Sequence, residues 1–198
     1  MSSWRQFDPE AVANPVPLSS AARVRVLGLD PGSRRTGFGI IDCEGNGHTH
    51  IANGCIAAPE QDSLAGRLRM IFEGVAGLIA EYRPDEIAIE RVFVNRNVDS
   101  AVKLGQARGA ALCAVPVGTS VFEYAPRAIK LAVVGSGAAE KSQVSHMMKV
   151  LLQLAAAPGV DAGDALAVAV CHAHTRRLQL LLNAQVTRRC APSGGGGG

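Results

Sequence analysis

The sequence has few of the features that would place a protein in a membrane or outside the cell. No apolar run is long and uninterrupted enough to cross a bilayer. The first residues, which include Trp4, Arg5, Asp8 and Glu10, lack the apolar core of a secretory signal. The five cysteines are scattered and never spaced as C-x-x-C, which argues against a disulfide framework or a zinc site. We therefore expect reduced thiols, no membrane partner and a cytoplasmic protein.

A strong excess of one charge is also missing, because the net charge is only +3 over 198 residues. The distribution of charge is uneven, however. Residues 1–90 hold 8 basic and 12 acidic side chains, residues 91–149 hold 8 and 3, and residues 150–198 hold 4 and 2. A basic middle beside an acidic first half is typical of a protein that binds a polyanion next to a carboxylate site, although ordinary solvated surface charge explains it equally well.

The composition changes at both ends of the chain. Residues 1–22 are rich in Ser, Ala and Pro, and residues 183–198 end in five glycines, so both are predicted to be flexible tails. Between them, residues 23–182 are long enough for one domain with a proper core. The expected strands are 23–30, 36–42, 48–57, 85–90 and 119–124, and the expected helices are 62–82 with an Asp62 cap, 98–115, 126–134, 140–154 and 161–182.

The order of these elements predicts an α/β fold. The first three strands are joined by short turns and form a meander, whereas the helical connections that follow require parallel, right-handed crossovers. The result is a mixed five-stranded sheet flanked by helices, which is the architecture of the ribonuclease H-like fold.

Two acidic residues end otherwise apolar strands. Asp30 follows the run Val-Leu-Gly-Leu, and Glu90 ends Ile-Ala-Ile-Glu. If these strands are parallel neighbours, the two carboxylates lie about 5 Å apart at one edge of the sheet, where they repel unless a cation or a proton lies between them. An Asx turn at Asp30 and an ion pair between Glu90 and Arg91 are the alternative interpretations.

A second acidic pair occurs late in the chain. Asp161 and Asp164 are spaced i, i+3 at the start of a predicted helix, so they share one helix face, although they also fit a simple capping pair. Together with Asp30 and Glu90 they form a set of hard oxygen ligands that suits Mg²⁺ or Mn²⁺. Two such ions would clamp a scissile phosphate and activate water.

Four stretches occur along the chain in the order LGLDPGSRRTGFGII, AIERVFVNRNVDSAVKLGQARGAAL, VFEYAPRAIKLAVVGSGAAEKSQV and DAGDALAVAVCHAH. In this order they resemble the bacterial RuvC family of Holliday junction resolvases, over roughly residues 24–175. The resemblance implies a ribonuclease H-like fold, a homodimer and Mg²⁺-dependent cleavage of four-way junction DNA, with two Mg²⁺ per active site and Mn²⁺ as a substitute. Symmetric nicks would leave 5′-phosphate and 3′-hydroxyl ends, and RuvA and RuvB would be the branch-migration partners.

The same resemblance implies roles for individual residues. The metal-binding acids of the family fall on Asp30, Glu90, Asp161 and Asp164, and none of them is substituted. Lys141 matches a lysine near the scissile phosphate and is expected to take part in catalysis. The residues expected to contact DNA are Phe93, which would stack on bases, Lys130 and Lys141, and more weakly Arg96, Asn97 and Arg34.

Three other functions remain open at this level. The first stretch also resembles the phosphate-binding hairpin of actin-like ATPases, but the chain is too short for two such lobes. A YqgF-type nuclease acting on RNA would share the acids without the stretch VFVNRNVDSAVKLGQARG. A junction-binding protein without catalysis would not need four intact acids.

Overall fold

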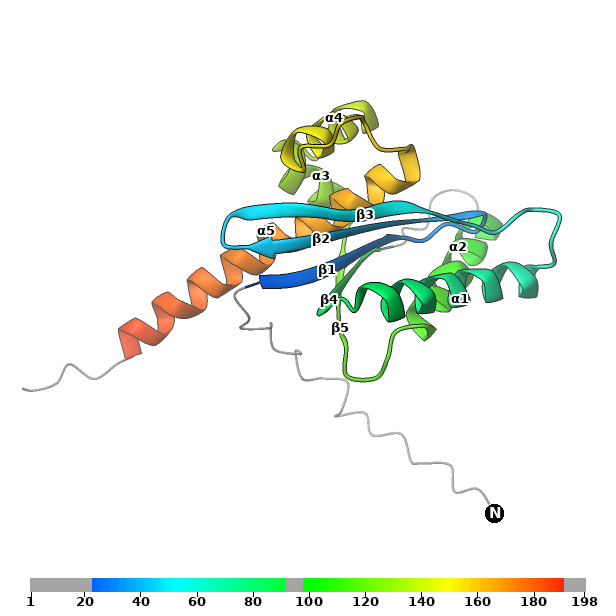
Figure 1. Cartoon of the computed structure of the whole chain (residues 1–198), viewed down its shortest axis with the longest axis horizontal. Coiled ribbons are helices and arrows are strands. Elements are labelled where there is room, and N and C mark those ends of the chain that lie inside the picture. The colour runs from blue at the N-terminus through cyan, green and yellow to red at the C-terminus, as the bar shows by residue number, and fades with distance from the viewer. Residues whose placement is uncertain (1–22, 92–97, 191–198) are drawn as a thin grey trace, which may run out of the picture.

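The computed structural model describes residues 23–91 and 98–190, with side chains as far as residue 182. Its centre is a five-stranded sheet of strand order β3-β2-β1-β4-β5 (Figure 1). The elements are β1 Arg23–Asp30, β2 Arg35–Glu44, β3 Gly47–Ala57, α1 Leu64–Tyr82, β4 Glu86–Glu90, α2 Val98–Cys113, β5 Ser120–Tyr124, α3 Pro126–Val134, α4 Lys141–Leu151 and α5 Val160–Cys190.

The pairing of the strands confirms the predicted mixed sheet. β1, β2 and β3 form an antiparallel meander in which Asp30 faces Gly37 across the first hairpin. β4 pairs with β1 and with β5 in parallel. In the β1–β4 register Leu29 lies beside Ile89, so the next residue of each strand is an acid, Asp30 or Glu90. The two acids therefore end neighbouring parallel strands at one edge of the sheet.

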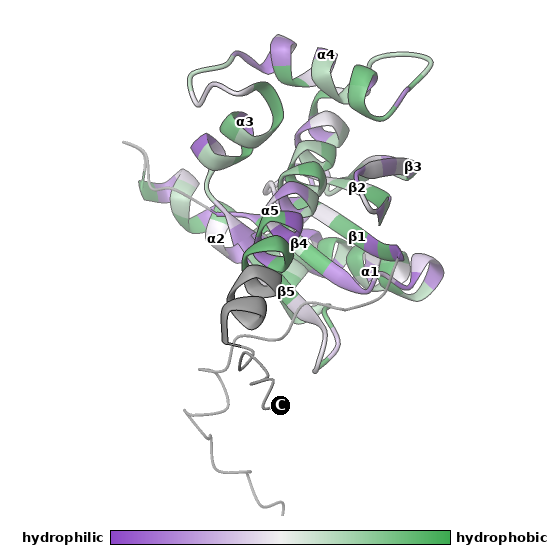
Figure 2. Cartoon of the chain, turned by 90° about the vertical axis from the view of Figure 1, so that its left-hand side faces the viewer, coloured by the Kyte–Doolittle hydropathy of each residue, from purple (hydrophilic) through white to green (hydrophobic). Residues whose placement is uncertain are grey.

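The sheet separates two hydrophobic cores because side chains of a strand alternate between its faces. In β1, Val24 and Val26 face the core built with α3, α4 and α5, whereas Leu27 and Leu29 face the core built with α1 and α2. Figures 1 and 2 show α3 and α4 on the side of the sheet opposite α1 and α2. By the same alternation Asp30 belongs with Val26, on the side of α5.

Glycines let α5 approach the sheet closely. A Cβ atom at Gly28 would lie 2.3 Å from the Ala165 carbonyl oxygen, and one at Gly37 would lie 2.0 Å from the Asp161 carbonyl oxygen. Real Cβ contacts are not this short, so any larger residue would force the helix away from β1 and β2. The glycines of the first hairpin therefore fix the position of the first turns of α5.

Several helix boundaries differ from the sequence prediction; α2, for example, ends at Cys113 instead of residue 115. The predicted Asp62 cap is wrong, because α1 begins one residue later and the Ser63 hydroxyl accepts a hydrogen bond from the Gly66 amide at 3.1 Å. α4 ends at Leu151 instead of residue 154. α5 continues to Cys190 instead of ending at residue 182, and Figure 1 shows this end of the helix extending beyond the sheet.

The sequence predicts reduced thiols and no membrane-spanning segment. Cys43, Cys55, Cys113 and Cys171 are free thiols, and burial raises the pKa of Cys171 to about 11. No helix in the described part of the chain is long and apolar enough to span a membrane.

Candidate active site

The candidate site is centred on Asp30 and Glu90. Their side chains lie beside each other at the carboxyl ends of β1 and β4, close enough for each to shift the pKa of the other. Burial raises the pKa of Asp30, and burial together with the neighbouring Asp30 raises the pKa of Glu90 well above its usual range. Two buried carboxyl groups this close favour one shared proton over two negative charges.

Asp164 and Lys141 complete the wall of a small cavity beside this pair. The cavity has a volume of about 310 Å³ and is also lined by Lys130. The Lys141 ammonium donates to Asp164 Oδ2 at 2.6 Å, and this hydrogen bond is the main reason why the pKa of Lys141 is raised. Three of the four acids singled out in the sequence and two lysines therefore converge from β1, β4, α3, α4 and α5.

Asp161 lies at the same edge but faces a different partner. It is close enough to Asp30 to raise the pKa of that carboxyl group, yet its Oδ2 atom accepts a hydrogen bond from Arg35 Nε at 2.6 Å. Asp161 does not line the cavity that holds the other three acids. Arg35 was not among the residues predicted from the sequence, because its contact depends on how closely α5 packs on β2.

The donor set fits a hard divalent cation. Among the described residues that line the cavity, the acidic groups are carboxylates and none is a histidine or cysteine, which is the ligand chemistry of Mg²⁺ and Mn²⁺. Two buried carboxylates ionise together only when a cation shares their charge, and Lys141 already supplies one positive charge to Asp164. Within residues 23–91 and 98–190, no group of three or more His, Cys, Asp or Glu side chains forms a ready-made metal centre.

A basic groove continues from the acidic edge on the side of Arg35. It has a volume of about 690 Å³ and lies between the β1–β2 turn, α1 and α2. Arg34 pairs with Glu60 at its rim, and Lys103 pairs with Asp99 at 2.6 Å. The basic residues that line the groove are Arg34, Arg35, Arg67 and Lys103.

Arg67 is the least exposed of these cations. Its Nη1 atom donates to the Ser33 carbonyl oxygen at 3.3 Å, and its Nε atom is buried without a hydrogen-bond partner in the described part of the chain. Of the groove residues, only Arg34 was predicted from the sequence to contact DNA. The sequence carries no periodic signal for Arg67 or Lys103, because their proximity arises from the packing of α1 against α2.

The remaining predicted DNA contacts, Phe93, Arg96 and Asn97, lie outside the described residues. The structure does define the point where their segment begins. Glu123 in β5 forms ion pairs with both Arg91 and Arg108, and the Arg91 amide donates to the Tyr124 carbonyl oxygen at 2.8 Å. Arg91 therefore pairs with Glu123, and the predicted alternative of an ion pair with Glu90 has no counterpart among the described contacts.

A buried polar network holds α5 against β4 and β5 beneath the site. Glu86 is 1% exposed, and its carboxylate contacts His172 Nε2 at 2.7 Å and Arg176 Nε at 3.1 Å. The Tyr124 hydroxyl contacts the other ring nitrogen of His172 at 2.8 Å. A buried carboxylate requires such partners, so the network fixes the rotation of α5 and hence the direction of Asp164.

The sheet order and the helices on its two faces define the ribonuclease H-like fold, and the acids at the ends of β1 and β4 place the candidate site where the two central strands end. Three comparisons with known proteins agree with this class. Residues 26–172 match the family model "Crossover junction endodeoxyribonuclease RuvC". A protein of that description from Shewanella sp. (strain W3-18-1) is 52% identical over 165 residues, which cover 83% of this chain and 95% of the relative.

Solved structures give the same result. A Thermus thermophilus RuvC in complex with Holliday junction substrate superposes with a TM-score of 0.75 at 31% identity, covering 79% of this chain and 96% of the other. The yeast mitochondrial Holliday junction resolvase Ydc2 has a TM-score of 0.60 at 11% identity over 84% of this chain and 86% of its own, a likeness of fold alone. The chain belongs to the RuvC family of crossover junction endodeoxyribonucleases.

Proposed function

We propose that this chain resolves Holliday junctions by metal-dependent hydrolysis of one phosphodiester at the edge formed by Asp30, Glu90 and Asp164. The observation that carries the proposal is the adjacent pair of carboxyl groups of Asp30 and Glu90, which lines one cavity together with the ion pair of Lys141 with Asp164. Such a site has acids for a cation and lysines for a phosphate within one cavity. The complex of the Thermus relative with a Holliday junction supports four-way DNA as the substrate.

In this proposal Asp30, Glu90, Asp161 and Asp164 hold two Mg²⁺ ions, with Mn²⁺ as a substitute. The bound ions would polarise the scissile phosphate and lower the pKa of the attacking water. Water attacks phosphorus, the bond to the 3′ oxygen breaks, and that oxygen leaves with a proton. The products carry a 5′-phosphate and a 3′-hydroxyl group.

In this proposal the lysines and the aromatic residue bind the DNA. With Asp164 engaged by a cation, Lys141 would be available to donate to a phosphate oxygen, where it would stabilise the negative charge that grows in the transition state. Lys130, from the neighbouring helix, binds the adjacent phosphate. Phe93, Arg96 and Asn97 would stack on bases and contact the backbone close to the junction centre.

The basic groove gives the DNA strand a path beyond the cavity. Because Arg35 contacts Asp161 at one end of the groove, a strand cut at the acids would continue along Arg67 and Lys103. Arg34 pairs with an exposed glutamate, so exchange of this partner for a phosphate costs little. The groove thus supports backbone contacts that do not depend on base sequence.

A four-way junction has two equivalent strands to cut, so we propose that the protein acts as a homodimer with one site per strand. At Gly105 and Gly109 of α2, an added Cβ would meet no atom of the described residues within 4 Å, so a second helix has room to approach closely. We also propose that RuvA and RuvB are the partners in cells, and that the protein works in the cytoplasm, where the chromosome lies.

The test is cleavage of a mobile synthetic junction by Asp30→Asn and Glu90→Gln, with products mapped on sequencing gels. Both variants are expected to lose nicking with Mg²⁺ while they bind the junction as tightly as the unchanged protein. Symmetric nicks with 5′-phosphate ends are expected for the unchanged protein. Full cutting by either variant would contradict the assignment of the acids.

A further inference from the structure

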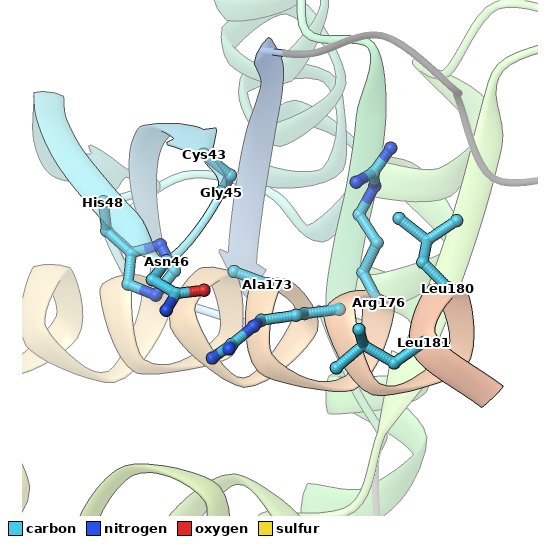
Figure 3. A pocket seen from close by; sticks show the side chains of 9 residues that line it. Cys43, Gly45, Asn46, His48, Ala173, Arg176, Leu180 and Leu181 are labelled. Carbon is cyan, nitrogen blue, oxygen red and sulfur yellow. The ribbon is translucent and has the colours of Figure 1, made fainter. Parts of the chain in front are cut away.

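A second cavity lies at the end of the sheet farthest from the acids. It has a volume of about 400 Å³ and opens between the β2–β3 turn and the part of α5 that follows the family match, which ends at residue 172 (Figure 3). Eight residues of β1 separate the two ends of the sheet, a distance of about 23 Å along the strand. This cavity is therefore separate from the candidate active site.

One side of the cavity is apolar and open. Leu180 and Leu181 line it from α5 and are 37% and 52% exposed, respectively. Figure 3 shows both leucines on the helix, with Asn46 and His48 from the β2–β3 hairpin also at the cavity. Neighbouring leucines in a hollow stabilise any apolar side chain that covers them, because both surfaces leave water.

The other side of the cavity is polar. The Nδ1 atom of His48 is buried and has no hydrogen-bond partner within the described residues. Burial and the nearby His174 lower the pKa of His48, so the ring is neutral and one polar atom requires a partner from elsewhere. Arg177 also lines the cavity and adds an exposed positive charge. The expected occupant therefore has apolar side chains, hydrogen-bonding groups and negative charge.

Residues 1–22 contain side chains of each of these kinds, and the segment joins the domain at Arg23, close to the cavity. The chain enters β1 at Arg23, whose partner in β2 is Glu44, and the next residue, Gly45, lines the cavity. The segment contains the single tryptophan of the protein, Trp4, together with Phe7 and the acids Asp8 and Glu10. Eighteen residues lie between Trp4 and Arg23, so the nineteen steps along the chain allow a reach of up to about 63 Å, far more than the path requires.

We infer that residues 1–22 fold back on their own domain and bind in this cavity, with Trp4 and Phe7 against Leu180 and Leu181. Asp8 and Glu10 then lie near Arg177, and a polar group of the segment pairs with His48. The long α5 and the N-terminal segment thus form one cap on the sheet end remote from the acids.

The tryptophan provides a direct test in the full chain. Its emission maximum is expected to lie to the blue of that of a peptide of residues 1–22, with weaker quenching by acrylamide and no dependence on protein concentration. Leu181→Asp is expected to shift the emission to that of the peptide. Leu182→Asp is the matched control, because Leu182 is equally exposed at 51% and does not line the cavity.

A second variant guards against a folding defect in Leu181→Asp. Arg177→Glu changes only an exposed charge and is expected to shift the emission in the same direction, with circular dichroism unchanged. Emission equal to that of the peptide in the unchanged protein would overturn the inference. So would equal shifts in Leu181→Asp and Leu182→Asp, or a blue shift that disappears on dilution, which would indicate a second copy as the occupant. Junction cleavage plays no part in these readings, so they stand apart from the proposed function.

Discussion

Gly37 in β2 lies directly against the backbone of Asp161 in α5: a Cβ atom on Gly37 would be 2.0 Å from the Asp161 carbonyl oxygen. The first hairpin and the last helix therefore meet without a side chain between them. This contact determines where both acids of α5 lie relative to Asp30.

Gly37→Ala is expected to push the start of α5 away from the sheet. The free energy of unfolding should fall by roughly 1–3 kcal/mol, as for other overpacked sites, and junction nicking should fall further because Asp161 and Asp164 move. Urea unfolding and single-turnover cleavage measure the two effects. Gly77→Ala is the control, since an added Cβ there meets no atom of the described part of the chain within 4 Å and a helical alanine adds up to about 1 kcal/mol of stability. An active, fully stable Gly37→Ala protein would contradict the close contact.

Divalent metal is expected to stabilise the protein more at pH 8 than at pH 5. The pKa values of Asp30 and Glu90 are raised, so the folded state holds a proton more tightly than the unfolded state. Stability from this pair is present at acidic pH and is lost as the pH rises through the folded pKa values, unless a cation replaces the proton. Thermal unfolding with and without Mg²⁺ measures the difference, which is about 2.7 kcal/mol at a metal concentration 100 times the Kd.

Asp30→Asn provides the control for that measurement. Without metal it is expected to be at least as stable as the unchanged protein at pH 8, because one of two repelling carboxylates is gone. Its stabilisation by Mg²⁺ should be much smaller. An equal response of both proteins would place the cation elsewhere.

Lys141→Ala is expected to slow the chemical step by about 10²–10³-fold, the usual effect of removing one group that stabilises transition-state charge. Junction binding should change little, because the loss is felt mainly in the transition state. Single-turnover rates at saturating protein give the comparison. Lys149→Ala, an exposed lysine of the same helix, should react at the unchanged rate.

Arg67→Gln is expected to weaken junction binding and to reduce the slope of log affinity against log salt by about one. The reason is that Arg67 lines the basic groove and its Nε atom has no partner within the described residues. Arg69→Gln is the matched control on the same helix, because Arg69 pairs with Glu73 outside the groove. Identical salt slopes for Arg67→Gln and the unchanged protein would remove the groove from the DNA path.

Asp42→Asn is expected to destabilise the fold at neutral pH but not in acid. Arg25 binds Asp42 through two hydrogen bonds of 2.7 and 2.9 Å, and this contact lowers the pKa of Asp42. The stability it provides is present above the usual aspartate range and is lost as the pH falls through the folded pKa. Urea unfolding should show a loss of about 1–3 kcal/mol at pH 7 that disappears near pH 2.

The sheet and the acids were predictable because local sequence encodes them. Apolar runs and glycine turns marked the strands, and the odd position of Asp30 and Glu90 at strand ends marked the site. The pairing of Arg35 with Asp161 was not predictable, since it depends on the distance between α5 and β2. The end of α5 was not predicted because the sequence after residue 182 has no helical period of apolar residues. The N-cap of α1 was placed one residue too early, because Asp62 and Ser63 are both good capping residues and Ser63 is the one that caps the helix.

The proposed site brings together residues from the first strand and the last helix, Asp30 and Asp164. A chain still on the ribosome, with α5 not yet made, has β1 and β4 but lacks Asp161, Asp164 and the helix that holds them in place. If these acids hold the metal ions as proposed, cutting awaits the finished polypeptide, and an incomplete copy of the chain lacks half of its site.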